Sequence, residues 1–189
     1  VYASKTSGIN GVIKQSVDDF VVEEVLVDGS KAQIDNSTEK LALGASLEKQ
    51  RYLLCVLVKR DWDTFIAVKN IAQQLHKSQN QIQIAGIKDS KALTAQYITI
   101  DQASMADTTN VTVKDIELRP VGYLREALST YYLLGNSFRI RIRDIRKSES
   151  DVKKQIADTI QELELAGGIP NFFGHQRFGT TRPITHLVG

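Results

Sequence analysis

Apolar and polar residues alternate along the chain with two periods, and each period predicts a different kind of element. Period-two alternation and short unbroken apolar runs predict strands over 12–14, 20–27, 52–58, 82–84, 97–100, 116–124 and 138–143. Helical spacing predicts two helices, over 63–77 and 150–166. We therefore expect an α+β fold, in which a mixed, largely antiparallel sheet carries both helices packed on one face.

Three of the predicted strands carry further information. The run 52–58 is apolar throughout, which indicates burial on both faces. Pro120 interrupts the run 116–124, which indicates an edge strand or a bulge. From Phe138 to Arg143, the alternation places apolar side chains on one face and arginines on the other. The last strand is therefore expected to be half-buried, with a basic outer face.

Composition limits the class of protein. With 189 residues, of which 42% are apolar and 24% charged, the chain can form one sizeable core, and we expect one globular domain. Cys55, the single cysteine, lies in an apolar run, which indicates a buried side chain in a reducing compartment. No signal peptide and no apolar run of about 18 residues is found, so we expect a soluble, cytoplasmic protein. The sequence does not fix the oligomeric state, and the simplest expectation is a monomer. The net charge of +2 is too small to identify an RNA partner.

A charged turn between two predicted strands holds the strongest candidate for catalysis, Asp89. Lys88 and Lys91 place an ammonium group on each side of it in the sequence, which favours its ionised form. Gly86 permits a close approach of the backbone or a positive φ. An ionised carboxylate can attack or hold an electrophilic carbon. The same residues also fit an ordinary turn, in which Asp89 or Ser90 caps one helical turn without any chemistry.

Other chemistries lack the residues that they need. The three histidines, His76, His175 and His186, lie far apart, and there are no cysteine pairs, so no metal site is expected. The sequence has no glycine-rich phosphate-binding motif, and we expect no cofactor. Cys55 has no basic neighbour close in sequence that would activate its thiol.

Five motifs, in order along the chain, resemble those of the TruD family of tRNA pseudouridine synthases. The most specific follows the pattern A-G-x-K-D-x-x-A-x-T-x-Q and stands here as Ala85, Gly86, Lys88, Asp89, Ala92, Thr94 and Gln96. The others are Gly11-Val12-Ile13-Lys14, Asp19-Phe20-Val21-Val22-Glu23-Glu24, Gly135-Asn136-Ser137-Phe138 and Asn171-Phe172-Phe173-Gly174-His175-Gln176-Arg177-Phe178-Gly179. The resemblance covers the chain nearly end to end and implies an archaeal-like member with the pseudouridine synthase fold.

The resemblance implies a tRNA pseudouridine synthase that isomerises a flipped-out uridine of the D arm, commonly position thirteen, without metal or cofactor. In such a member Asp89 is the catalytic nucleophile, and Lys14 lies beside it and orients it. Phe138 stacks on the uracil, Asn136 hydrogen-bonds the uracil or its sugar, and Phe20 lies at the edge of the pocket. The remaining candidate substrate-binding residues are Lys88, Gln96, Gln176 and Arg177.

Two further expectations accompany the resemblance. Family members are longer, with an inserted domain after the Gln-Arg-Phe-Gly motif, so residues 1–189 are expected to be a catalytic domain that is incomplete at its C-terminus and lacks that insert. The basic face formed by Arg139, Arg141 and Arg143 leaves a second function open, a non-catalytic RNA-binding module on the same fold.

Overall fold

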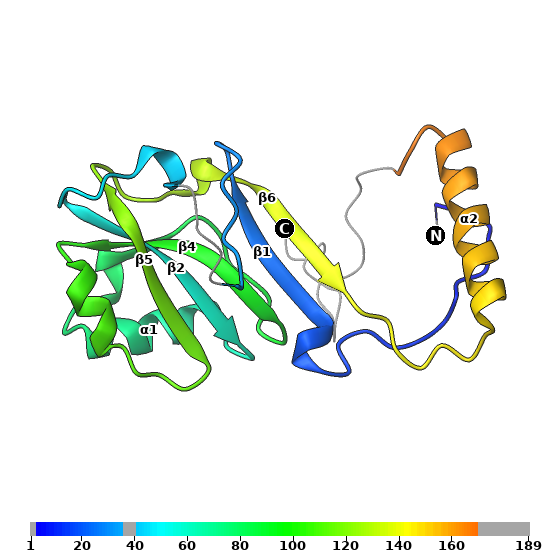
Figure 1. Ribbon diagram of the computed structural model, residues 1–189, viewed down its shortest axis with the longest axis horizontal. Helices are drawn as coiled ribbons and strands as arrows, with labels where there is room; N and C mark the ends of the chain where they lie inside the picture. Colours follow the sequence, from blue (N-terminus) through cyan, green and yellow to red (C-terminus); the bar gives the residue numbers. More distant parts are fainter. Residues whose placement is uncertain (1–2, 36–40, 170–189) are drawn as a thin grey trace, which may run out of the picture. The chain divides into compact units, whose positions relative to one another are not determined.

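The computed structural model describes residues 3–35 and 41–169 of the chain (Figure 1). The chain divides into two compact units, which are described separately. Of the described residues, 12–35 and 41–143 form the larger unit, and 3–11 with 144–169 form the other.

A six-stranded sheet forms the larger unit, in the order β5-β2-β4-β1-β6 with β3 paired to β4. Its strands are β1 (Phe20–Leu26), β2 (Tyr52–Arg60), β3 (Ile82–Ile84), β4 (Leu93–Asp101), β5 (Ile116–Leu124) and β6 (Leu133–Ile140). Only β1 and β4 pair in parallel; the other four pairings among these strands are antiparallel. The predicted mixed, largely antiparallel sheet is therefore confirmed.

Two strands share one edge of β4. β1 pairs with Leu93–Ala95, and β3 pairs with Ile98–Ile100, so the sheet branches between these two segments. At the branch, the N–H of Tyr97 donates to Oε2 of Glu24 at 2.9 Å. A side-chain carboxylate therefore accepts the N–H of a buried residue at the point where the neighbouring strand changes.

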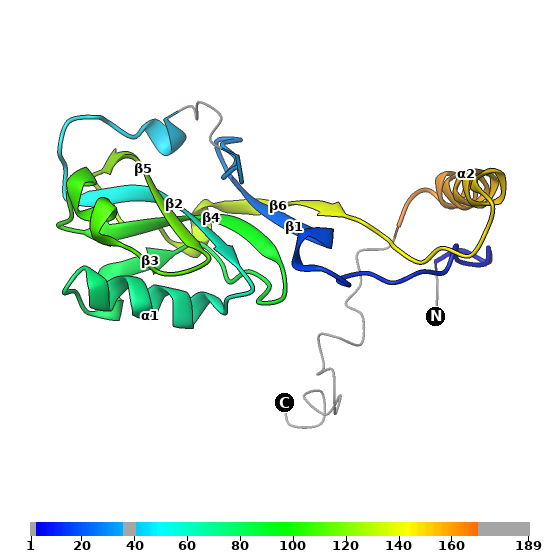
Figure 2. The ribbon, with the colours of Figure 1, turned by 60° about the horizontal axis from the view of Figure 1, so that its bottom comes forward.

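Apolar packing covers both faces of the central strands. Residues 53–59 of β2 are buried, so the predicted burial holds for 53–58, whereas Tyr52 is only partly buried and the buried segment also includes Lys59. Helix α1 (Thr64–Gln74), capped by Asp63, packs Ala67, Val68 and Ile71 against one face of the sheet. Figure 2 shows α1 below β2 and β4, with the segment that carries the short helix η2 on the other side. The short 3-10 helices are η1 (Val17–Asp19), η2 (Ala42–Gly44), η3 (Gln79–Gln81), η4 (Met105–Asn110) and η5 (Thr130–Tyr132).

The edges of the sheet confirm one prediction and correct two others. β5 is an edge strand, and its register against β2 shifts next to Pro120, so both alternatives for that proline hold. Residues 12–14 do not form a strand, because only Val12 makes a bridge, to Arg143. β6 begins at Leu133, earlier than expected, and ends at Ile140.

The apolar face that the alternation predicted for β6 is not covered by another element. Phe138 and Ile140 of β6 are 54% and 46% exposed, and Ile142, just beyond its end, is 40% exposed. The physical reason is that β6 lies at the edge of the sheet and extends beyond the part that α1 covers. Alternation of apolar and polar residues therefore predicts a half-buried strand only where another element covers the apolar face.

The smaller unit contains helix α2 (Glu149–Leu165), whose Ser148 N-cap accepts from the N–H of Asp151. The N-terminal segment contacts this helix, because the N–H of Lys5 donates to Glu162 at 2.8 Å. The expected packing of α2 on the sheet stays a prediction. No helix in the described ranges 3–35 and 41–169 has both the length and the apolar character that a membrane span requires.

Candidate active site

The loop between β3 and β4, residues 85–92, carries Asp89 and packs tightly against β1 and β6. A Cβ on Gly86 would lie 2.9 Å from Cδ2 of Leu133 and 3.1 Å from Nζ of Lys88. Gly86 does not have a positive φ, so a glycine is required here because the backbone approaches its neighbours closely and not because of its backbone conformation.

Buried polar side chains hold the loop from below. Nε2 of Gln96 donates to the carbonyl of Gly86 at 2.9 Å. The Thr64 hydroxyl lies 3.2 Å from both the carbonyl and the N–H of Lys88, donating to the first and accepting from the second. Nζ of Lys88 forms an ion pair with Oε1 of Glu24 at 2.6 Å, and both side chains are almost fully buried. Burial raises the pKa of Glu24, and Lys88 opposes part of that change.

This geometry bears on two of the proposed substrate-binding residues. The Lys88 ammonium is 2% exposed and pairs with Glu24, and Gln96 is fully buried. Both side chains point into the protein and hold the loop, so their positions favour a supporting role over direct contact with a ligand.

Asp89 lies on the outer side of the loop, beside Lys14. Nζ of Lys14 donates to Oδ1 of Asp89 at 2.9 Å, and the two side chains are 29% and 35% exposed. The same ammonium lies 3.9 Å from the centroid of the Phe20 ring, a cation–π contact. Lys14 adopts a φ of 58°, a left-handed conformation that is uncommon for a residue other than glycine and recurs at functional sites.

Two aromatic rings extend the site from β1 to the edge strand β6. The Phe20 and Phe138 rings meet edge to face, with centroids 6.0 Å apart. Val22 pairs with Phe138 and Glu24 pairs with Asn136 across β1 and β6. Residues directly opposite in a sheet point to the same face, so Asn136 and Phe138 extend from the face that carries Glu24 and Phe20.

The structure therefore brings five of the sequence-predicted residues together on one face, namely Asp89, Lys14, Phe20, Phe138 and Asn136. A carboxylate accessible to solvent stands beside a cation and two aromatic rings. Such a surface can stack a planar base on Phe138 while the carboxylate approaches the attached sugar. Gln176 and Arg177 lie outside the described residues.

Lys59, which the sequence analysis did not select, also contacts this site. It is the eighth residue of β2 and is fully buried. Its ammonium donates to the carbonyl of Asp89 at 2.8 Å and to that of Trp62 at 2.7 Å. In the sequence, the only indication of this role is that Lys59 directly follows seven mostly apolar strand residues. A lysine in that position usually lies at a strand end and faces solvent.

The three arginines near the end of β6 do not form one free basic surface. Nε of Arg143 lies 2.8 Å from both carboxylate oxygens of Asp19. The hydrogen bond from Arg143 lowers the pKa of the Asp19 carboxyl. Arg139 and Arg141 are exposed.

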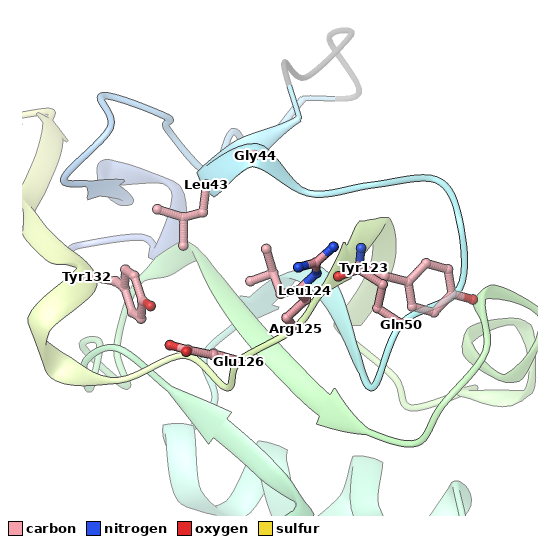
Figure 3. Close-up of a pocket in the computed structure, with 8 residues that line it drawn as sticks. All are labelled: Leu43, Gly44, Gln50, Tyr123, Leu124, Arg125, Glu126 and Tyr132. Carbon is pink, nitrogen blue, oxygen red and sulfur yellow. The ribbon is translucent and has the colours of Figure 1, made fainter.

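A cavity of about 380 Å³ lies at the other end of the sheet (Figure 3). Leu124, at its rim, pairs with Tyr52 at the start of β2, whereas Lys59 lies near the end of that strand. The cavity is therefore separate from the Asp89 site. In the described part of the chain, no three histidine, cysteine, aspartate or glutamate side chains gather where they could hold a metal ion.

Comparisons with known proteins show which family the chain belongs to. The family model of "tRNA pseudouridine synthase D (TruD)" matches residues 1–189. The chain is 38% identical over 189 residues to a protein of Methanosarcina mazei and 39% identical over 188 residues to one of Thermococcus onnurineus, both named "Probable tRNA pseudouridine synthase D". In each case the match covers the whole chain and 40% of the relative's length.

A solved structure has a similar fold. The crystal structure of the "Putative tRNA pseudouridine synthase D (TruD)" from Methanosarcina mazei superimposes with a TM-score of 0.81 at 37% identity, over the whole of this chain and 39% of that one. The chain therefore belongs to the tRNA pseudouridine synthase D (TruD) family.

Proposed function

We propose that this chain carries the catalytic residues of a tRNA pseudouridine synthase, with Asp89 as the nucleophile. The observation that carries the proposal is the contact of the Asp89 carboxylate with Lys14 at 2.9 Å, next to the aromatic pair of Phe20 and Phe138. The chain spans about 40% of the length of the relatives that it matches.

The reaction breaks the N1–C1′ bond of a uridine, turns the detached uracil and joins C5 to C1′. The proton on C5 leaves and the freed N1 takes up a proton, so the product is an isomer of uridine and no oxidant or reductant is needed. Asp89 acts by adding to the sugar, adding to the ring or removing a sugar proton. Lys14 holds its carboxylate in place, and Phe138, 54% exposed, provides a flat surface for the extruded base.

The substrate that we propose is a uridine in the D arm of tRNA, at position thirteen, flipped out of its stack. The family match supports the tRNA class, and the exposed aromatic and amide groups of β6 support recognition of an unstacked base. Action as a monomer in the cytoplasm remains an expectation from the sequence.

A second function has one observation in its favour. Arg139 and Arg141 are exposed, alternate with Phe138 along the chain and could contact phosphates, on the face opposite Phe138, in a non-catalytic RNA-binding module. In that case Arg141→Glu weakens tRNA binding, and Asp89→Asn changes nothing.

The test uses the complete product of the gene that encodes this chain, incubated with unmodified tRNA that is then digested to nucleosides and separated by chromatography. Wild type should yield pseudouridine, and Asp89→Asn should yield none while its tRNA affinity stays within about twofold. Glu23→Gln is a matched control, because it disrupts another carboxylate–lysine pair, with Lys31 at 2.8 Å. Equal product from Asp89→Asn and wild type would contradict the proposal.

A further inference from the structure

Lys59 places a buried ammonium group directly beneath the backbone of Asp89. Its side chain is fully buried, and its two hydrogen bonds, of 2.8 Å and 2.7 Å, go to the carbonyls of Asp89 and Trp62. Trp62 lies just before α1, so one ammonium ties the end of β2, the start of α1 and the catalytic loop together. Hydrogen bonds from a charged donor are about twice as strong as neutral ones.

The charges around Lys59 come from two elements. Asp63 caps α1, and Asp89 lies in the loop; both favour the charged form of Lys59, whereas Lys88 in the loop opposes it. Burial is the largest influence and lowers the pKa of Lys59 to about 8. The ammonium is therefore held at a net cost of solvation, and it loses its charge in mildly alkaline solution.

We propose that Lys59 is a positioning residue for the reaction: by binding the carbonyl of Asp89, it fixes the loop so that the Asp89 carboxylate remains at Lys14. This assignment rests on the proposed function of Asp89. Lys59 does not touch the substrate in this role. A misplacement of a reacting group by about 1 Å can lower a rate on the order of 100-fold, so the effect should appear in the chemical step and not in tRNA binding.

The experiment measures the single-turnover rate of pseudouridine formation and the tRNA dissociation constant for the complete gene product. Lys59→Met should lower the rate on the order of 100-fold and leave the dissociation constant within about twofold. Lys77→Met is the matched control. Its ammonium also donates to two backbone carbonyls, Asp101 at 2.7 Å and Gln102 at 3.2 Å, but at the far end of β4. The Lys77 variant should keep the wild-type rate.

A pH profile separates positioning from a merely structural role and does not require the methionine variant to fold. The wild-type rate should fall as the pH rises through about 8, because Lys59 loses its charge there. In Lys59→Arg the cation persists at every pH used, so this fall should be absent.

Each result decides the assignment. A Lys59→Met rate within about threefold of wild type, or an alkaline fall that is missing in wild type or unchanged in Lys59→Arg, overturns it. Asp89→Asn, measured alongside, distinguishes the two failures. If Asp89→Asn is inactive and Lys59→Met is not, the proposed function stands and the role of Lys59 falls. If wild type forms no pseudouridine, both fall.

Discussion

Removal of one partner from the buried ion pair behind the catalytic loop should produce a loss of stability that depends on pH. Lys88→Met leaves the carboxylate of Glu24 without its cation in a site where both side chains are at most 2% exposed. At 2.6 Å and an effective dielectric constant of about 20, the attraction removed is about 6 kcal/mol. Glu24 avoids the full loss by taking up a proton.

Proton uptake sets the expected size. Relative to an ordinary glutamate with a pKa of about 4.3, protonation costs about 4 kcal/mol at pH 7 and about 1 kcal/mol at pH 5. A folded-state pKa that is raised contributes stability at low pH and loses it as the pH rises. Burial already raises the pKa of Glu24 in the wild type, so these costs are upper limits, and Lys88→Met should lower the free energy of unfolding by up to about 4 kcal/mol at pH 7 and by up to about 1 kcal/mol at pH 5.

Urea unfolding, followed by the fluorescence of the single tryptophan, Trp62, measures this difference. The double variant Lys88→Met/Glu24→Gln should recover at least half of the loss, because glutamine still accepts from the N–H of Tyr97 and carries no charge. Arg51→Met disrupts a pair in which the arginine is 60% exposed and should cost at most about 1 kcal/mol. An equal loss for Lys88→Met at pH 5 and pH 7 would refute the reasoning.

Three shorter predictions concern the same unit. Gly86→Ala should lower the free energy of unfolding by about 1–3 kcal/mol through overpacking, whereas Gly135→Ala, where a Cβ meets nothing within 4 Å, should cost less; urea unfolding compares them. Arg143 holds the pKa of the Asp19 carboxyl low, so the ion pair of these two residues contributes stability above about pH 4. That stability should disappear as the pH falls through the folded-state pKa of Asp19, and Asp19→Asn should lack this acid dependence in urea titrations from about pH 2 to 5. Lys14→Met should lower the single-turnover rate on the order of 100-fold with tRNA affinity unchanged, and an unchanged rate would remove its orienting role.

Local sequence patterns predicted best those elements whose own apolar pattern requires burial. The unbroken apolar run of β2 requires burial and is found in the core. The apolar stripe of α1 is only partly confirmed: Val68, Ile71 and Ala72 lie in the core, whereas Phe65 and Ile66 are exposed. Pro120 could be placed at an edge and at a bulge because it cannot donate a ladder hydrogen bond. The alternation at the end of β6 failed for the complementary reason: it implies a covering element but does not supply one.

The candidate site depended on contacts that are distant in sequence. Charge spacing alone left Asp89 as an ordinary turn, and the family motifs were needed to associate it with Lys14, which the structure places 2.9 Å away. The role of Lys59 could not be predicted from the sequence, because a lysine near a strand end usually reaches solvent. Here the loop around Asp89 and the residues before α1 enclose it, and no local pattern encodes that enclosure.

The most direct test of the account is tritium release from tRNA labelled at C5 of uridine, with the complete gene product as wild type and as Asp89→Asn. C5 loses its hydrogen only when the uracil has been turned and rejoined to the sugar. Release by wild type and none by Asp89→Asn, with both proteins folded and binding tRNA, is the result that we expect. Release by both proteins would contradict the catalytic role of Asp89, and release by neither would favour the RNA-binding module.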